Sequence, residues 1–241
     1  MATTGHCAYV FECLVSNFQG RKPLSLETVL QLWDEWESRS REASSSSSSS
    51  GTSLPDGKSL NESLPNGNVS SPSRDGKYPL FVSYNTHPGK VLRGCLGTFE
   101  PQRLEPGLKN FALSSALEDP RFSPITARLL PKLSAHVTLL TNFSEPSKDA
   151  LDWIVGFHGI RISFTYKGRK MGATYLPYVA KDQGWKQEDA IVSLMHKAGW
   201  QGKDWQKTWK DGEGKLTTYQ GNQVGLSYDD WHQWREWVAH R

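Results

Sequence analysis

Residues 91–100 read VLRGCLGTFE, and this stretch determines the interpretation of its surroundings. Its apolar residues predict a strand, residues 78–86 (YPLFVSYNT) predict a second strand, and residues 87–90 (HPGK) predict the turn between them, so the segment is expected to form a β-hairpin. An arginine, a cysteine and two glycines stand where a core strand usually carries valine or isoleucine. The strand therefore requires unusual backbone geometry, a thiol at this position, or both.

Residues two apart in a strand share a face, which places Arg93 beside Cys95. A neighbouring guanidinium favours thiolate over thiol and would lower the pKa of the cysteine. Gly94 and Gly97 flank the thiol, and glycine within a strand marks a bulge or the close approach of another backbone or a ligand. The pattern suits a nucleophile, a redox thiol or an anion site. The alternative is a packing residue, because free cysteine is among the most buried residue types.

Other side chains are candidates for proton transfer or binding. His158 stands in a glycine-flanked turn, VGFHGI, where functional residues often lie. Asp119 and Arg121 straddle Pro120 after a predicted helix, and they either present charge to a site or fasten a loop. Thr174 offers a hydroxyl near the end of a strand. No HxxxH, HExxH, paired-cysteine, P-loop or GxGxxG pattern is present, so neither a metal nor a cofactor is expected.

Around the first hairpin, periodicity predicts a mixture of helices and strands. Helices are expected over residues 6–18, 26–36, 107–119, 187–199 and 227–240, strands over 133–143 and 215–220, and a second hairpin over 158–177. Because the elements lack a regular βαβ rhythm, the fold class is α+β with a mostly antiparallel sheet and packed helices.

Composition divides the chain into three parts. Residues 1–20 form the N-terminal helix of the domain, and residues 76–241 form its remainder. Between them, residues 21–75 are predicted to be an insertion with one amphipathic helix and a serine-rich disordered loop. Seven consecutive serines and the surrounding Pro, Gly and Asn cannot bury enough apolar area to offset conformational entropy.

Charge and cysteine content restrict the function classes. The formal net charge is only +3 and no block of Lys and Arg occurs, so no nucleic-acid partner is expected. The first residues lack a basic segment, Glu12 interrupts their apolar run, and no uninterrupted apolar stretch of about 18 residues is found, so neither a signal peptide nor a membrane span is expected. Three cysteines without a paired spacing indicate a reducing compartment, hence a cytoplasmic or nuclear location or both.

Four segments in order resemble the AMMECR-domain family: LRGCLGTF (92–99), SALEDPRF (115–122), LDWIVGFHGIRISF (151–164) and ATYLPYVAKDQGW (173–185). The resemblance implies an α+β fold with two lobes and a functional centre at the RGCxG motif, but no reaction. The residues of this sequence that match the family's motifs are Arg93, Gly94, Cys95, Gly97, Asp119, Pro120, Arg121, Phe122, His158, Thr174 and Pro177.

Two hypotheses follow, and whether the protein is an enzyme is left open between them. In the first, a small-molecule or redox-related site is centred on Cys95, with Arg93 stabilising the thiolate and His158 or Asp119 handling protons. The proposed binding residues of that site are Gly94, Gly97, Asp119, Arg121, Phe122 and Thr174. In the second, the chain is a protein-binding or scaffold module, Cys95 is a packing residue, and Trp33, Trp36 and the insertion contact a partner protein.

Overall fold

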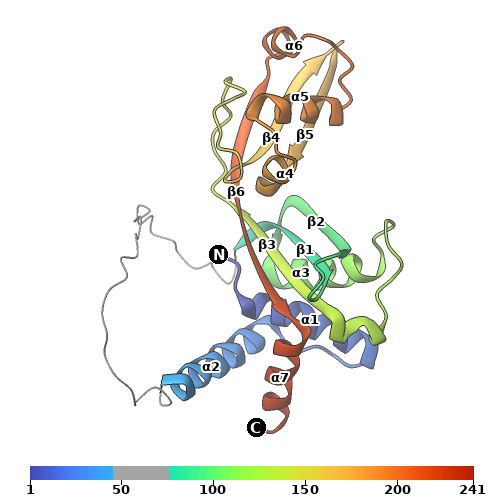
Figure 1. Cartoon of the computed structure of the whole chain (residues 1–241), viewed down its shortest axis with the longest axis vertical. Coiled ribbons are helices and arrows are strands. Elements are labelled where there is room, and N and C mark those ends of the chain that lie inside the picture. Colours follow the sequence, from blue (N-terminus) through green and yellow to red (C-terminus); the bar gives the residue numbers. More distant parts are fainter. Residues whose placement is uncertain (46–75) are drawn as a thin grey trace. The chain divides into compact units, whose positions relative to one another are not determined.

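The computed structural model describes residues 1–45 and 76–241, and these residues form an α+β fold (Figure 1). The serine-rich loop was predicted from Ser38 to about Gly76. Its residues 46–75 lie outside the described residues, whereas residues 38–45 belong to a helix instead. The described chain divides into two compact units, residues 1–137 with 224–241 and residues 138–223. The expected class, with two lobes and a mostly antiparallel sheet, is confirmed. The strand order is β2-β1-β3-β6-β4-β5, and two strands, β3 (Leu133–Thr141) and β6 (Lys215–Ser227), contribute residues to both units.

The first unit contains the predicted hairpin. Strand β1 (Lys77–Thr86) pairs antiparallel with β2 (Leu92–Arg103), with Ser83 opposite Cys95. Helix α3 (Leu104–Leu117) packs against both strands, and on β1 the side chains of Leu80, Val82 and Tyr84 are fully buried. The Tyr84 hydroxyl donates a hydrogen bond to the carbonyl of Ala112 in α3 (3.0 Å). The hairpin therefore has one face closed by α3 and an opposite, half-buried face.

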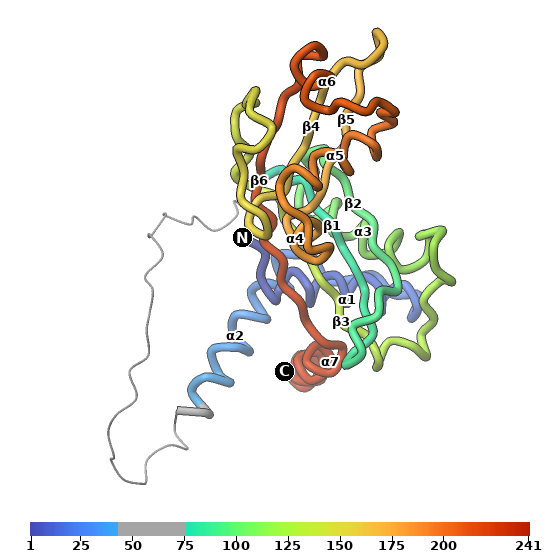
Figure 2. Tube along the Cα trace, turned by 45° about the horizontal axis from the view of Figure 1, so that its top comes forward, coloured from blue at the N-terminus to red at the C-terminus, as the bar shows by residue number. Residues whose placement is uncertain are grey.

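Three further α-helices lie in the described part of this unit. Helix α1 (Thr4–Gln19) is buried over most of its length. It packs on α3 and on α2 (Leu26–Ser45) (Figure 2). Ser25 opens α2 by accepting a hydrogen bond from the amide of Thr28 (3.2 Å). Ser227 caps helix α7 (Tyr228–Ala239), which buries Trp231 and Trp234. A short 3-10 helix (Ala127–Lys132) precedes β3.

The second unit is built on the predicted second hairpin. Strands β4 (Gly159–Tyr166) and β5 (Arg169–Tyr175) pair antiparallel, and β4 also pairs with β6. Helices α4 (Pro177–Asp182), α5 (Gln187–Lys197) and α6 (Trp205–Asp211) belong to the same unit. Gly199 ends α5 with a positive φ of 99°, the left-handed conformation expected just after a helix. The apolar core of this unit includes Trp153, Ile162, Leu194 and Trp209.

Two further expectations change in this part of the fold. Trp33 is almost fully buried and packs against Trp36 and Trp234, with ring centroids 5.0 and 5.6 Å apart, so it is not available to a partner protein. The last strand runs to Ser227 rather than Gln220. None of the helices in residues 1–45 and 76–241 combines the length and the hydropathy that a membrane span requires.

Candidate functional site

The two glycines of the RGCLG segment are required by the protein's own packing. A Cβ atom on Gly94 would overlap the carbonyl oxygen of Ser115 in α3 and lie 3.0 Å from its carbonyl carbon. A Cβ atom on Gly97 would overlap the carbonyl oxygen of Leu80 and the ring of Phe81 in β1. Because the neighbours are backbone atoms and a packed ring, they cannot move aside cheaply. The sequence pattern left open whether a ligand or the chain itself approaches these glycines, and the space is filled by the chain.

Asp119 fastens the loop after α3 to the cysteine. Its carboxylate accepts hydrogen bonds from the amide of Cys95 (2.9 Å) and from the amide of Arg121 (3.1 Å). The guanidinium of Arg121 donates two more, from Nε (2.9 Å) and from Nη2 (2.7 Å). Asp119 is only 5% exposed, so four donors replace the water that it loses on burial. The Arg121 side chain and these hydrogen bonds hold the pKa of the Asp119 carboxyl well below its usual range.

Arg121 binds the second polar group of the Cys95 main chain and is itself exposed to solvent. Its Nη2 group donates to the carbonyl of Cys95 (2.8 Å), so both polar groups of the Cys95 main chain are bound by the Asp119–Arg121 pair. The Arg121 side chain is 56% exposed, and its guanidinium carbon lies 5.3 Å from the centre of the Phe122 ring. Solvent screening at this exposed end reduces what the ion pair contributes to stability. The pair acts mainly through geometry, because it fixes the course of β2 at the cysteine.

Burial raises the pKa of the Cys95 thiol, which is the reverse of the shift expected from an Arg93 neighbour. The cation that opposes the effect of burial is Arg121, while the Asp119 carboxylate adds to it. Arg93 is not among the groups that shift this pKa. The Arg93 Nε atom is instead buried without a hydrogen-bond partner within the described residues. The role expected of Arg93, to favour the thiolate, falls to Arg121 in this structure, although Arg93 and Cys95 share a face of β2.

Ser115 is a site residue that the sequence pattern did not single out. Its hydroxyl accepts from the amide of Leu96 (2.9 Å) and donates to the carbonyl of Val82 (2.9 Å), which ties α3 to both strands of the hairpin. Ser115 is fully buried. A small polar residue on the apolar face of the predicted helix was the available signal, since a buried hydroxyl needs partners.

His158 and Thr174 belong to the second unit, whereas Cys95, Asp119 and Arg121 belong to the first. The His158 Nδ1 atom accepts from the amide of Ile154 (3.1 Å) and thereby holds its own turn. The Thr174 hydroxyl donates to the carbonyl of Ile160 (2.9 Å) across the β4–β5 hairpin and contacts the Tyr219 hydroxyl (2.9 Å). Both side chains thus have local roles. The group that the structure brings together is Cys95, Asp119, Arg121 and Phe122.

The other two cysteines do not join this group. Cys7 and Cys13 lie buried in α1, and burial raises the pKa of each thiol to about 12. In the part of the chain that the structure describes, no three His, Cys, Asp or Glu side chains are arranged to hold a metal ion. The chemistry available at the cluster is hydrogen bonding and charge pairing around one partly buried thiol.

Comparison with known proteins supports the resemblance seen in the sequence. The sequence profile of the AMMECR1 family matches residues 12–224. An uncharacterized protein of Schizosaccharomyces pombe is 40% identical over 64% of this chain and 77% of its own length, and one of Arabidopsis thaliana is 47% identical over 53% and 62%. A crystal structure of an uncharacterized protein from Pyrococcus horikoshii has a TM-score of 0.51 at 22% identity, covering 69% of this chain and 82% of that one, a likeness of fold.

Proposed function

This chain belongs to the AMMECR1 family, and we propose that it is a non-catalytic binding module in which the RGCLG segment is a rigid platform and Cys95 a protonated packing residue. The observation that carries the proposal is the fastening of Cys95. Asp119 and Arg121 bind its amide and its carbonyl, and backbone or ring atoms of the same chain fill the space beside both glycines. A segment fixed in this way keeps its neighbours in one geometry, which lowers the entropy lost on binding.

The state of the thiol also supports a non-catalytic role. The thiolate, not the thiol, is the nucleophile. In catalytic cysteines a helix N-terminus, a cation or a histidine lowers the pKa of the thiol. Here burial raises the pKa of Cys95, and Asp119 adds a negative charge nearby. The small-molecule or redox alternative has one observation in its favour, the Arg121 guanidinium, which favours the thiolate but is already bound to Asp119.

The surface proposed for binding is the hairpin face opposite α3, named here the hairpin face: Phe81, Ser83, Arg93, Cys95 and Phe99. Strand alternation places these residues on one side, and all are half-buried. The Phe81 and Phe99 rings pack edge to face at 5.1 Å. Arg93 adds a buried Nε donor without a partner among the described residues. An unpaired buried donor costs free energy, so a partner protein that supplies a carboxylate there would gain a charge-assisted hydrogen bond.

The first test is the reactivity of Cys95 toward iodoacetamide as a function of pH, followed by mass spectrometry of the native protein. We expect slow alkylation with an apparent pKa above about 8.5, the value of a free thiol. Cys95→Ala is the matched control, because Cys7 and Cys13 are more deeply buried and their signal should be unchanged in it. Rapid alkylation with an apparent pKa below the free-thiol value would contradict the packing role and favour the enzyme hypothesis.

The second test addresses the hairpin face directly. A photo-crosslinking amino acid at position 83 is expected to give a discrete protein adduct in cells, and Arg93→Gln in the same chain should reduce its yield about tenfold, which corresponds to the loss of one charge-assisted hydrogen bond. The same crosslinker at Lys170, an exposed position in β5, serves as the control. Adducts that are equal at both positions, or that do not depend on Arg93, would rule out the hairpin face as the binding surface.

A further inference from the structure

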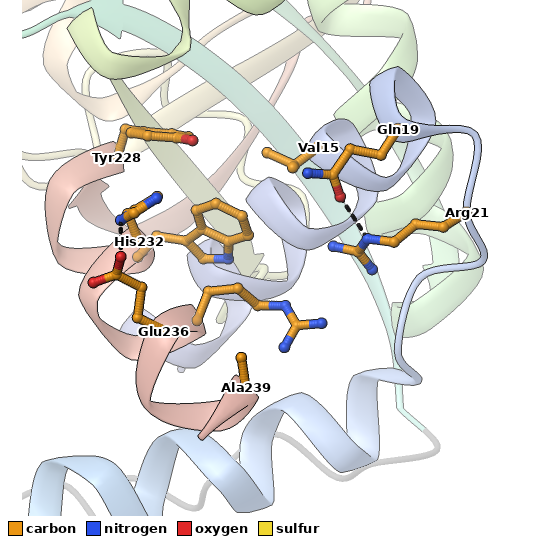
Figure 3. A pocket seen from close by; sticks show the side chains of 9 residues that line it. Val15, Gln19, Arg21, Tyr228, His232, Glu236 and Ala239 are labelled. Carbon is orange, nitrogen blue, oxygen red and sulfur yellow. Dashed lines mark hydrogen bonds and ion pairs between the residues drawn. The ribbon is translucent and has the colours of Figure 1, made fainter. Parts of the chain in front are cut away.

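A cavity of about 290 Å³ lies in the first unit between α1 and α7, away from the RGCLG segment. Figure 3 shows Val15 and Gln19 reaching it from α1, Tyr228 and His232 from α7, and Arg21 from the chain after α1. Trp231 and Arg235 also line it. The volume is near the lower end of the range found for small-molecule sites.

A buried carboxylate forms ion pairs with the two arginines that line this cavity. Glu12 in α1 is fully buried and pairs bidentately with Arg21, through Nη1 to Oε1 (2.5 Å) and Nη2 to Oε2 (3.0 Å). Arg235 of α7 makes a longer ion pair with the same carboxylate, from Nε to Oε2 (3.5 Å). Two guanidiniums therefore face one buried carboxylate, a surplus of one positive charge that the exposed Glu236 carboxylate, also in the lining, offsets in part.

Two donors that belong to residues lining the cavity are not used by the protein itself. The Trp231 side chain is almost fully buried, and its Nε1 atom has no hydrogen-bond partner within the described residues. Arg235 uses only Nε in its ion pair with Glu12, and its side chain is 28% exposed. By contrast, Arg21 uses all three of its nitrogens, since Nε donates to Gln19 (2.7 Å) and both Nη groups donate to Glu12. An unpaired indole N–H beside a partly free guanidinium is a donor set for an oxyanion.

The remaining wall limits the charge and shape of what fits. Val15, Trp231 and Tyr228 supply apolar and aromatic surface. Glu236, at the rim and 3.7 Å from His232, places a negative charge near the entrance. That charge disfavours a doubly charged phosphate more than a singly charged carboxylate, because like charges repel. We propose that the α1–α7 cavity is a binding site for a small carboxylate with a flat apolar body, held by Arg235 and the Trp231 indole N–H.

Titration calorimetry with benzoate, benzamide and phenyl phosphate tests this site. We expect benzoate to bind at least about tenfold more tightly than neutral benzamide, and Arg235→Gln to remove that preference, since one charged hydrogen bond accounts for such a factor. Arg169→Gln, which removes an exposed guanidinium from β5, should leave binding unchanged. Ala239→Phe narrows the cavity without altering its charges and should also weaken benzoate.

A spectroscopic readout separates binding from loss of fold. In the NMR spectrum of the full chain, the indole N–H signal of Trp231 is the one that disappears in Trp231→Phe. This signal should shift on addition of benzoate, and the other indole N–H signals should not. Equal affinity for benzoate and benzamide, or unchanged benzoate binding in Arg235→Gln with the fold intact by circular dichroism, would overturn the proposal. Tighter binding of phenyl phosphate than of benzoate would overturn the choice of a carboxylate.

Discussion

Gly94→Ala is expected to lower the free energy of unfolding by about 3 kcal/mol, the upper end of the usual cost of overpacking, because the overlapped atoms are backbone atoms that cannot move aside cheaply. The added methyl group would overlap the carbonyl oxygen of Ser115, which belongs to the backbone of α3. Relief requires α3 to move away from the hairpin. That movement would break the hydrogen bond that the Ser115 hydroxyl donates to the Val82 carbonyl and the one that it accepts from the Leu96 amide. Urea denaturation followed by circular dichroism measures the change.

Gly89→Ala in the turn of the same hairpin is the matched control. A Cβ atom there would lie 3.2 Å from the Thr86 hydroxyl, the end of a small side chain, and we expect a change within about 1 kcal/mol. If Gly94→Ala were as mild as Gly89→Ala, the close approach of α3 to β2 would be wrong. Gly94 would then be available for a ligand, as the first sequence hypothesis held.

Local patterns predicted most elements of the fold correctly. The two hairpins, α1, α5 and α7 follow from alternation or helical spacing within single segments, together with Ser and Gly residues at the helix ends. Strand β6 was predicted too short because Gly221, Asn222 and Gly225 interrupt its apolar pattern. A Cβ atom on Gly225 would overlap the ring of His136 in β3, so this glycine serves a neighbour that is distant in sequence.

The site was predicted less completely, because its contacts also join residues that are distant in sequence. The strand pattern singled out Cys95 and its two glycines, and the segment around Pro120 singled out Asp119 and Arg121 as a pair that either fastens a loop or presents charge. Neither could show which arginine affects the thiol. Arg93 is two residues away along the strand, whereas Arg121 is brought to Cys95 by the loop after α3, a contact that only the folded chain creates. Ser115 was missed because its partners lie on two different strands.

Glu12→Gln is expected to lower the free energy of unfolding by about 3 kcal/mol, since removing one partner of a buried ion pair leaves the others uncompensated. The sequence showed Glu12 only as an interruption of an apolar run. In the structure its carboxylate accepts from Arg21, from the amide of Leu24 (3.1 Å) and from the hydroxyl of Ser16 (3.3 Å). A glutamine has one acceptor oxygen, and its amide group would face a guanidinium.

Thermal and urea denaturation of Glu12→Gln should be compared with Glu236→Gln, an exposed carboxylate at the rim of the same cavity, for which we expect a change within about 0.5 kcal/mol. The double variant Glu12→Gln/Arg235→Gln should be less destabilised than the sum of the two single variants, because removing the carboxylate also removes the ion pair that Arg235 would lose. Additive effects would show that Arg235 is not held by Glu12. In that case Arg21 would be the only one of the two cavity-lining arginines that Glu12 holds in place.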